Sequence, residues 1–140
     1  MSTFALHPRL AADTHPVASL PLCELLLMDD ARYPWLILVP RVIGATGIDE
    51  LDFAARHALI DEVDEISRLL RAEVRPERIN VAALGNLVPQ LHVHVVARFR
   101  NDPAWPGPVW GHAPAQPYDE AARAGRVTRL RAALGHGGTA

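Results

Sequence analysis

The sequence predicts a single α+β domain, in which short strands pack with one long helix and a shorter C-terminal helix. Short apolar runs of strand length come in neighbouring pairs joined by polar turns, as in β-hairpins. Between the two pairs lies one long stretch whose apolar residues recur at helical spacing. A chain of 140 residues suits one domain, 1–140, and no internal repeat divides it.

The first pair of strands follows an irregular start. Residues 6–21 are expected to lack long elements, because three prolines interrupt them. Residues 22–28 form a short apolar run suited to a strand, and the polar turn 29–34 leads to a second strand at 35–39. Pro40 ends that strand, so the two runs are predicted to form a β-hairpin.

Residues 48–74 are predicted to form the long helix. Acidic residues gather in its first turn and arginines near its end, which suits the helix dipole, and Pro76 ends it. His57 lies on this helix and is expected to be a surface or boundary histidine. The apolar stripe consists of Leu51, Ala55, Leu59, Val63, Ile66 and Leu70.

The second pair of strands is expected at 78–83 and 87–98, joined by a tight turn at 84–86. The segment 102–111 is too rich in proline and glycine for regular structure and too rich in tryptophan for a free linker. It is therefore expected to pack on the domain. The last helix is predicted at residues 119–134.

Composition narrows the function classes. The chain is 49% hydrophobic and 21% charged with a net charge of −2, which is ordinary for a globular protein and gives no basic surface for nucleic acid. No apolar run has membrane-spanning length and the first ten residues lack a signal pattern. No membrane partner is therefore expected, and the expected location is cytoplasmic. The single Cys23 excludes an internal disulfide and a cysteine metal cluster.

A row of polar side chains interrupts the last predicted strand. Because alternate residues of a strand face opposite sides, Gln90, His92 and His94 share one face, and Leu91, Val93 and Val95 share the other. Burying three polar groups without partners costs a few kcal/mol each, roughly, so the polar row is expected to line a cleft.

Three interpretations of this row remain open. A neutral imidazole attacks phosphorus well, and a second histidine can donate a hydrogen bond to phosphate oxygens. Two histidines at i and i+2 can also bind a metal, or they can simply lie on a hydrated sheet face. The metal interpretation is the weakest, because Cys23, His112 and the scattered acids supply no local pattern of further ligands. No metal or other cofactor is expected.

The stretch from Gln90 to Val96 is similar to the signature of the histidine triad family, His-x-His-x-His followed by two apolar residues. The resemblance extends over residues 22–111. Ile79-Asn-Val followed by Gly85-Asn resembles the strand and Gly-Gln turn before the family motif, and Leu36-Ile-Leu-Val-Pro resembles its Leu-Val-Ile-Pro strand. Trp105-Pro-Gly resembles the Trp-Pro-Pro-Gly tail of the nucleoside phosphoramidase branch.

The resemblance implies a single-domain antiparallel sheet of about five strands with helices packed on one side, paired as a homodimer. It implies a hydrolase or nucleotidyl transferase acting on the α-phosphate of dinucleoside polyphosphates, nucleoside phosphoramidates or nucleotide sugars. The reaction passes through a covalent nucleotidyl-histidine and needs no metal in the chemical step. By position, His92 matches the nucleophile and His94 the histidine that contacts phosphate.

Further nucleotide-binding residues follow from the same resemblance. Asn80 or Asn86, with backbone amides near the motif, would stabilise charge on the phosphoryl oxygens. Asp29 or Asp30, in the hairpin turn, would accept hydrogen bonds from ribose hydroxyls, although a plain turn residue explains either one equally well. Trp105 would approach the site of the neighbouring subunit, and packing in the core or interface is the simpler role for it.

The chain departs from the family pattern at three positions. Gln90 replaces the first histidine, and its amide can donate and accept hydrogen bonds but cannot titrate. Leu87 stands where a phosphate-binding Ser or Thr is expected, and Trp35 where many members have histidine. His94 is retained where the uridylyl-transferase branch has Gln, which favours hydrolysis. The alternative is a nucleotide-binding or sensing module with little turnover; a structural dimerisation protein ranks third.

Overall fold

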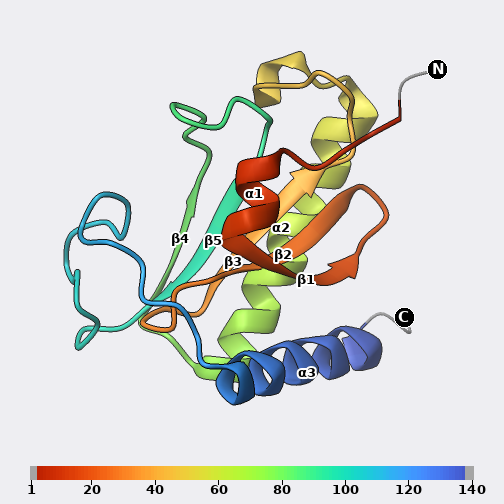
Figure 1. The fold of residues 1–140 in the computed structure, drawn as a ribbon. Coiled ribbons are helices and arrows are strands. Elements are labelled where there is room, and N and C mark those ends of the chain that lie inside the picture. The colour runs from red at the N-terminus through yellow and green to blue at the C-terminus, as the bar shows by residue number, and fades with distance from the viewer. Residues whose placement is uncertain (1–2, 138–140) are drawn as a thin grey trace.

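The computed structural model describes residues 3–137, which form one five-stranded antiparallel sheet and three α-helices (Figure 1). The predicted α+β architecture is thereby confirmed. Across the sheet the strands run β1 (Thr14–Ser19), β2 (Cys23–Met28), β3 (Trp35–Pro40), β5 (Val93–Arg98) and β4 (Arg78–Ala82). The helices are α1 (Pro8–Asp13), α2 (Phe53–Val74) and α3 (Glu120–Gly137). No helix within the described residues is both long and apolar enough to cross a membrane.

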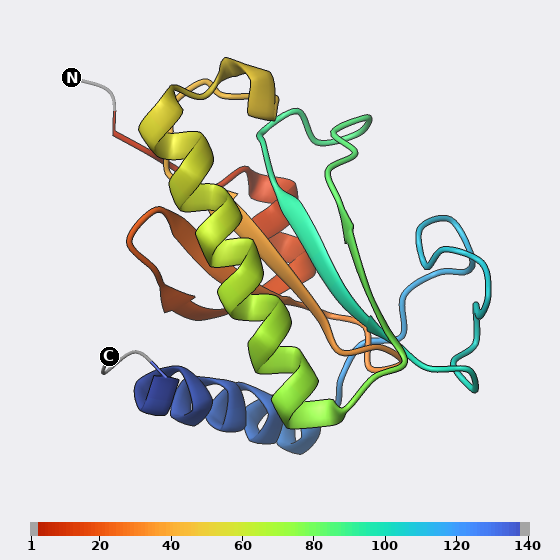
Figure 2. The ribbon, with the colours of Figure 1, turned by 180° about the vertical axis from the view of Figure 1, so that it is seen from behind.

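Helices cover both faces of the sheet. The short α1 lies on one face in Figure 1, and the view from behind shows α2 running across the other face, with α3 beside its end (Figure 2). The expectation that the helices pack on one side is therefore wrong for α1. The core between the sheet and α2 is made of aliphatic side chains, among them Leu25, Leu36, Leu59, Ile66 and Val95.

A second hydrophobic cluster lies on the face that α1 covers. Alternation along β3 separates the two: Leu36 and Leu38 join the α2 core, whereas Trp35 and Ile37 join the α1 side. Leu10 of α1 is 4% exposed and packs into this second cluster. The face therefore carries a wall of its own, built from α1.

The N-terminal region is regular, where the sequence indicated an irregular segment at 6–21. Pro8 is the first residue of α1, a position at which the helix needs no backbone N–H. Pro16 lies in β1, which is an edge strand, and the pairing with β2 shifts register between Pro16 and Ala18. Each proline is thus tolerated by its position, and β1 supplies the fifth strand.

The predicted helix at 48–74 is split at its start. Ile48–Glu50 form a 3₁₀ turn, and α2 begins only at Phe53. Asp52 is the N-cap residue, since its carboxylate accepts a hydrogen bond of 2.8 Å from the N–H of Ala55. At the other end Arg75 adopts a left-handed conformation before Pro76.

The strand predicted at 87–98 begins only at Val93. Residues 83–92 form a long connection from β4 instead of a tight turn, and Gly85 within it has a positive φ of 72°. The N–H of Leu91 donates to the carbonyl oxygen of Ala45 at 3.0 Å. Ala45 lies in the loop after β3, so this bond is not part of the sheet. The alternation nevertheless continues upstream of the strand, because Leu91 joins the α2 core and His92 faces the opposite side.

Candidate functional site

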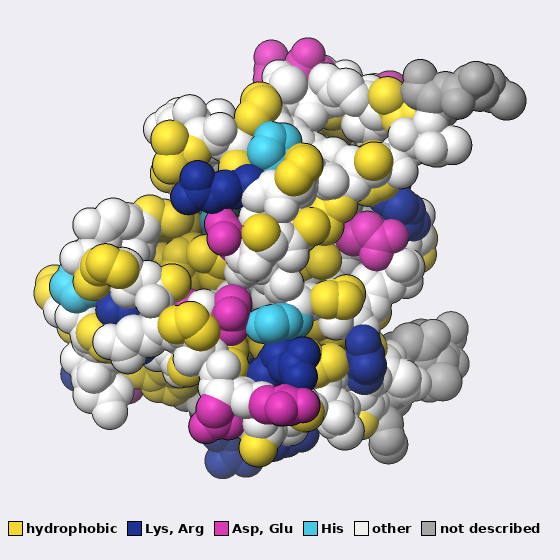
Figure 3. Space-filling view, viewed as in Figure 1, with side chains coloured by type: hydrophobic (Ala, Val, Ile, Leu, Met, Phe, Trp, Pro, Cys, Tyr) yellow, Lys and Arg dark blue, Asp and Glu magenta, His cyan; other side chains and the backbone are white. Residues whose placement is uncertain are grey.

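A cavity of about 440 Å³ opens on the face of the sheet that α1 covers. Its floor is formed by β3 and β5, and its walls by α1, by the connection between β4 and β5, and by residues 109–115. In the space-filling view a hollow with hydrophobic side chains lies between α1 and the segment that follows β5 (Figure 3). Apolar walls around a few polar groups are typical of small-molecule sites.

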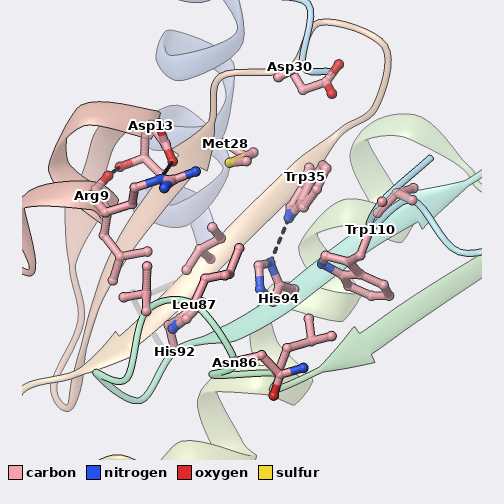
Figure 4. Close-up of a pocket in the computed structure, with 18 of the residues that line it drawn as sticks. Arg9, Asp13, Met28, Asp30, Trp35, Asn86, Leu87, His92, His94 and Trp110 are labelled. Atoms are coloured by element: carbon pink, nitrogen blue, oxygen red, sulfur yellow. Dashed lines mark hydrogen bonds and ion pairs between the residues drawn. The ribbon is translucent and has the colours of Figure 1, made fainter. Parts of the chain in front are cut away.

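His92 and His94 form the polar centre of this cavity (Figure 4). Their side chains are 7% and 6% exposed, and their ring centroids lie 5.0 Å apart with the planes inclined at 67°. Both residues face the cavity because Val93 between them turns into the α2 core. The predicted cleft for the polar row is therefore present for the two histidines.

The hydrogen bonds fix opposite tautomers on the two rings. Nδ1 of His92 lies 2.7 Å from the carbonyl oxygen of Gln90, which can only accept, so Nδ1 carries the proton and Nε2 of the neutral ring has a free lone pair. Nδ1 of His94 lies 3.0 Å from the indole N–H of Trp35, which can only donate, so a proton on this ring sits on Nε2. One ring thus offers a nucleophile and the other a hydrogen-bond donor.

The surroundings of His94 keep this ring neutral. Burial, assisted by the neighbouring His92, lowers the pKa of His94 to about 3. The rings of Trp35 and Trp110 enclose it, with centroids 5.7 and 5.4 Å from that of His94. The donor tautomer of His94 therefore persists throughout the neutral pH range.

Each charged side chain that lines the cavity, Arg9, Asp13 or Asp30, forms an ion pair. Arg9 and Asp13 of α1 form an ion pair with Nε and Oδ2 3.2 Å apart. Asp30 is 2% exposed and is held by Nε and Nη2 of Arg32 at 2.9 and 2.8 Å. Among the described residues, Arg9 is the only Arg or Lys that lines the cavity.

A buried arginine positions the wall opposite α1. Arg98 is 2% exposed and binds both carboxylate oxygens of Asp102, with Nε–Oδ2 2.8 Å and Nη2–Oδ1 3.0 Å. It also donates to Oδ1 of Asn80 at 2.8 Å and to the carbonyl oxygen of Gly107 at 2.7 Å. These bonds tie the segment after β5 to β4, so that Trp110 reaches the cavity.

Three of the residues predicted from the sequence line the cavity, namely His92, His94 and Asn86. Asp30 lines it as well, as the second of the two aspartates considered for the ribose. Asn86 is exposed and lies on the connection between β4 and β5, at the rim (Figure 4). His57 is exposed on α2 and stacks on Phe53, as expected for a surface histidine.

Asn80, Asp29 and Trp105 are not among the lining residues. Asn80 is engaged by Arg98, as described above. Asp29 accepts a hydrogen bond from the backbone N–H of Tyr118 at 3.0 Å and lies 3.1 Å from Nε2 of His15. The ring of Trp105 packs against the guanidinium of Arg98, with 5.8 Å from Cζ to the ring centroid.

Gln90 also lies outside the cavity. Its Oε1 accepts from the backbone N–H of His7 at 2.8 Å, and its Nε2 donates to the carbonyl oxygen of Ala5 at 2.9 Å. The side chain that replaces the first histidine of the motif therefore holds the N-terminal segment, while its backbone carbonyl orients His92.

Sequence reasoning missed three side chains of the site, those of Arg9, Asp13 and Trp110, and it missed the donor role of Trp35. The signal for α1 was Pro8, because proline is common at the first position of a helix. Trp35 was recognisable only from register, since it pairs with Val96 and so stands diagonally across from His94. Among residues 3–137, no group of three or more His, Cys, Asp or Glu side chains is placed to hold a metal ion.

The chain is similar in sequence and in structure to known proteins of one family. The family model described as the HIT domain matches residues 9–101. A histidine triad protein from Marinobacter aquaeolei has 46% identity and a TM-score of 0.93, with 96% of this chain and 98% of that chain covered. One from Bradyrhizobium japonicum has 42% identity and a TM-score of 0.92, with 95% and 99% covered.

A third histidine triad protein, from Sinorhizobium meliloti, has 42% identity and a TM-score of 0.92, and the alignment covers 94% of this chain and 98% of that one. A comparison with curated protein sequences finds no match. The matched range includes both cavity histidines, and the similar structures share the whole fold. The chain therefore belongs to the HIT domain, or histidine triad, family.

Proposed function

We propose that this protein is a hydrolase or nucleotidyl transferase acting at the α-phosphate of dinucleoside polyphosphates or nucleoside phosphoramidates. The observation that carries the proposal is the pair of opposite tautomers on His92 and His94. Family membership supports nucleotides as the ligand class. A lone pair beside a neutral N–H donor, in a largely apolar cavity, suits attack on a phosphate ester or amide.

In the first step Nε2 of His92 attacks the α-phosphorus, and the bond from phosphorus to the leaving group breaks. A phosphate leaving group departs as an anion, and an amine takes its proton from water. Negative charge grows on the phosphoryl oxygens, where Nε2–H of His94 donates a hydrogen bond. In the second step water, or another hydroxyl acceptor, attacks the phosphorus of nucleotidyl-His92. The bond from phosphorus to Nε2 breaks, the proton of the acceptor passes to solvent, and the ring is freed.

Other lining groups would bind the rest of the nucleotide. Met28, Ile37 and Val109 present apolar surface suited to a base. Asn86, at the rim, would donate to phosphate oxygens, and Asp30 or Asp29 would accept from ribose hydroxyls. Asn80 would act indirectly, through its bond to Arg98. Each of these roles is part of the proposal.

The second candidate is a nucleotide-binding or sensing module with little turnover. Gln90 favours it, because no titratable side chain stands at the first motif position. We prefer an enzyme to a binding module, because the tautomer of His92 is set by the backbone carbonyl of Gln90. That carbonyl is present whether residue 90 is Gln or His. A side chain at position 90 is not needed to expose the lone pair.

A homodimer and a cytoplasmic location complete the proposal. The dimer is supported by the open edge of β4, where Val81 is 48% exposed, and by the adjoining Leu87, which is 85% exposed. Edge strands with apolar side chains are usually covered or paired. In such a dimer Trp105 of one protomer would approach the site of its partner.

The decisive experiment compares the wild type with His92→Ala and with the control His57→Ala, which alters an exposed histidine on α2. Each protein is incubated with an adenylated amine and with diadenosine tetraphosphate in the presence of a chelator. The wild type and the control should release nucleotide, and quenched wild type should carry a nucleotidyl adduct on His92. His92→Ala should fold, bind nucleoside monophosphate and release none; full activity in this variant would refute the mechanism.

A further inference from the structure

The hydrogen bonds of Gln90 match those of a neighbouring strand. In an extended chain the carbonyl of one residue and the N–H two residues later point to the same side. Ala5 and His7 present that pair, and the Gln90 amide meets it with its N–H₂ at 2.9 Å and its oxygen at 2.8 Å. A neutral imidazole carries its donor and its acceptor on two separate ring nitrogens, so it cannot make both bonds in this way.

This contact sets where α1 begins. His7 is the N-cap residue, and its Nδ1 accepts from the N–H of Arg9 at 3.0 Å. The far end of the helix is fixed too, because the N–H of Asp29 donates to the carbonyl oxygen of Asp13 at 3.0 Å. Leu10 is buried between these two ends. Gln90 therefore holds one end of the wall that carries Arg9.

Arg9 lines the same cavity as the two histidines, from the wall that α1 forms. The histidines project from the sheet, and α1 stands over the same face (Figures 1 and 4). In an in-line displacement the leaving group departs opposite the nucleophile. A leaving group displaced by a histidine of the sheet would therefore move away from the sheet, on the side where α1 stands. The Arg9 side chain is 62% exposed there.

The pair between Arg9 and Asp13 leaves the guanidinium available. Both side chains are largely exposed, at 62% and 44%, and an exposed pair at i and i+4 is worth only about 0.3–0.5 kcal/mol. A phosphate oxyanion can take the place of the carboxylate and accept two parallel N–H donors. The other carboxylate of the lining, Asp30, is already neutralised by Arg32.

We propose that Arg9 is a substrate-binding residue for an anionic leaving group, a phosphate or polyphosphate, and that Gln90 is the positioning residue that keeps Arg9 at the cavity. This inference rests on the proposed function and narrows its substrate class. Gln90 would thus position α1, a role different from that of the first histidine of the motif. Arg9 would supply the phosphate contact that a Ser or Thr at position 87 is expected to make.

The test compares two substrates with the same adenylyl group. Diadenosine tetraphosphate has an anionic leaving group, and an adenosine phosphoramidate of a neutral amine does not. Arg9→Met should lower kcat/KM for the first by roughly 10- to 100-fold, the range of a lost charge-assisted hydrogen bond, and change it less than about twofold for the second. Arg9→Lys should recover part of the loss.

Arg68→Met is the matched control, because Arg68 forms the same kind of exposed i, i+4 pair with Asp64 on α2, at 2.9 Å. It should leave both substrates unaffected. Arg9→Met acting equally on both substrates, or on neither, would overturn the role of Arg9 while leaving the proposed function intact. A wild type that neither binds nor processes either substrate would overturn both.

Gln90→Ala tests the positioning role. It should reproduce the selective loss on diadenosine tetraphosphate and increase hydrogen exchange over residues 5–13. Combined with Arg9→Met it should add less than about twofold, because both changes remove one interaction. Fully multiplicative effects of the two changes, or equal losses on the two substrates, would show that Gln90 acts elsewhere.

Discussion

The indole nitrogen of Trp35 lies 3.0 Å from Nδ1 of His94, and this bond decides which nitrogen of His94 faces the cavity as a donor. At the position of Trp35 the resemblance to the histidine triad family predicts histidine. An indole can only donate, so it fixes the tautomer more strictly than an imidazole, which can do either. Trp35 thus fixes His94 as a donor, the opposite of the role that the backbone carbonyl of Gln90 gives to His92.

Trp35→Phe should lower kcat by up to roughly tenfold, since a neutral hydrogen bond contributes about 0.5–1.5 kcal/mol. The ring of His94 would then populate both tautomers. Nitrogen-15 NMR of the imidazoles should show a single Nε2–H tautomer in the wild type and a mixture in the variant. Trp110→Phe is the control, because Trp110 touches His94 only through its ring, at 5.4 Å between centroids. An unchanged tautomer in Trp35→Phe would contradict this role.

The buried His94 should make the protein sensitive to mild acid. Its folded-state pKa of about 3 is below the ordinary 6.5, so the unfolded chain takes up this proton first as pH falls. Stability is then lost between about pH 6.5 and 3, at roughly 1.4 kcal/mol per pH unit. From pH 7 to 5 the wild type should lose roughly 2 kcal/mol more than His94→Gln. Urea unfolding at the two pH values measures this, and parallel losses would contradict it.

Arg98 should be among the most important polar residues for stability. Arg98→Met leaves Asp102, 4% exposed, without its partner, and such a change costs about 3–5 kcal/mol. It also releases the segment that carries Trp110, so nucleotide binding should weaken in parallel. Denaturant unfolding checks the first effect. Arg68→Met, which breaks the exposed pair on α2, should change stability by less than about 0.5 kcal/mol. Similar losses of stability in Arg98→Met and Arg68→Met would show that burial does not decide how much an ion pair contributes.

Trp105 supplies a test of the proposed dimer. Within one protomer it packs on Arg98 outside the cavity, so a direct role in nucleotide handling requires a second copy. Light scattering should show a dimer at micromolar concentration, and Trp105→Ala should weaken activity more than it lowers Tm.

Mixing Trp105→Ala with His92→Ala provides the sharper measurement. In a mixed dimer the intact His92 of one protomer meets the intact Trp105 of its partner, so activity should rise above that of either variant alone. A stable, fully active monomer, or a mixture with no gain, would refute the shared site.

Much of the fold was predictable because it depends on local patterns. The hairpin of β2 and β3 follows from two short apolar runs around a polar turn, and the long α2 from apolar residues at helical spacing. Where the prediction was wrong, a tertiary contact changes the local structure. Before β5, the N–H of Leu91 donates to the carbonyl oxygen of Ala45 and not to a strand. Near the N-terminus, Pro16 is tolerated because β1 is an edge strand, and Pro8 because it is the first residue of α1.

The sequence by itself determined which two histidines share a face, because alternation along an extended chain needs no partner. It could not determine which nitrogen of His94 donates. That depends on the indole of Trp35, which the register of β3 against β5 brings to the ring. The carbonyl oxygen that orients His92 is local, only two residues before it, whereas the wall built from α1 again requires the folded sheet. Hydrogen-bond partners distant along the chain are selected by register and packing, and for this reason the chemistry of His94 is decided by the tertiary structure.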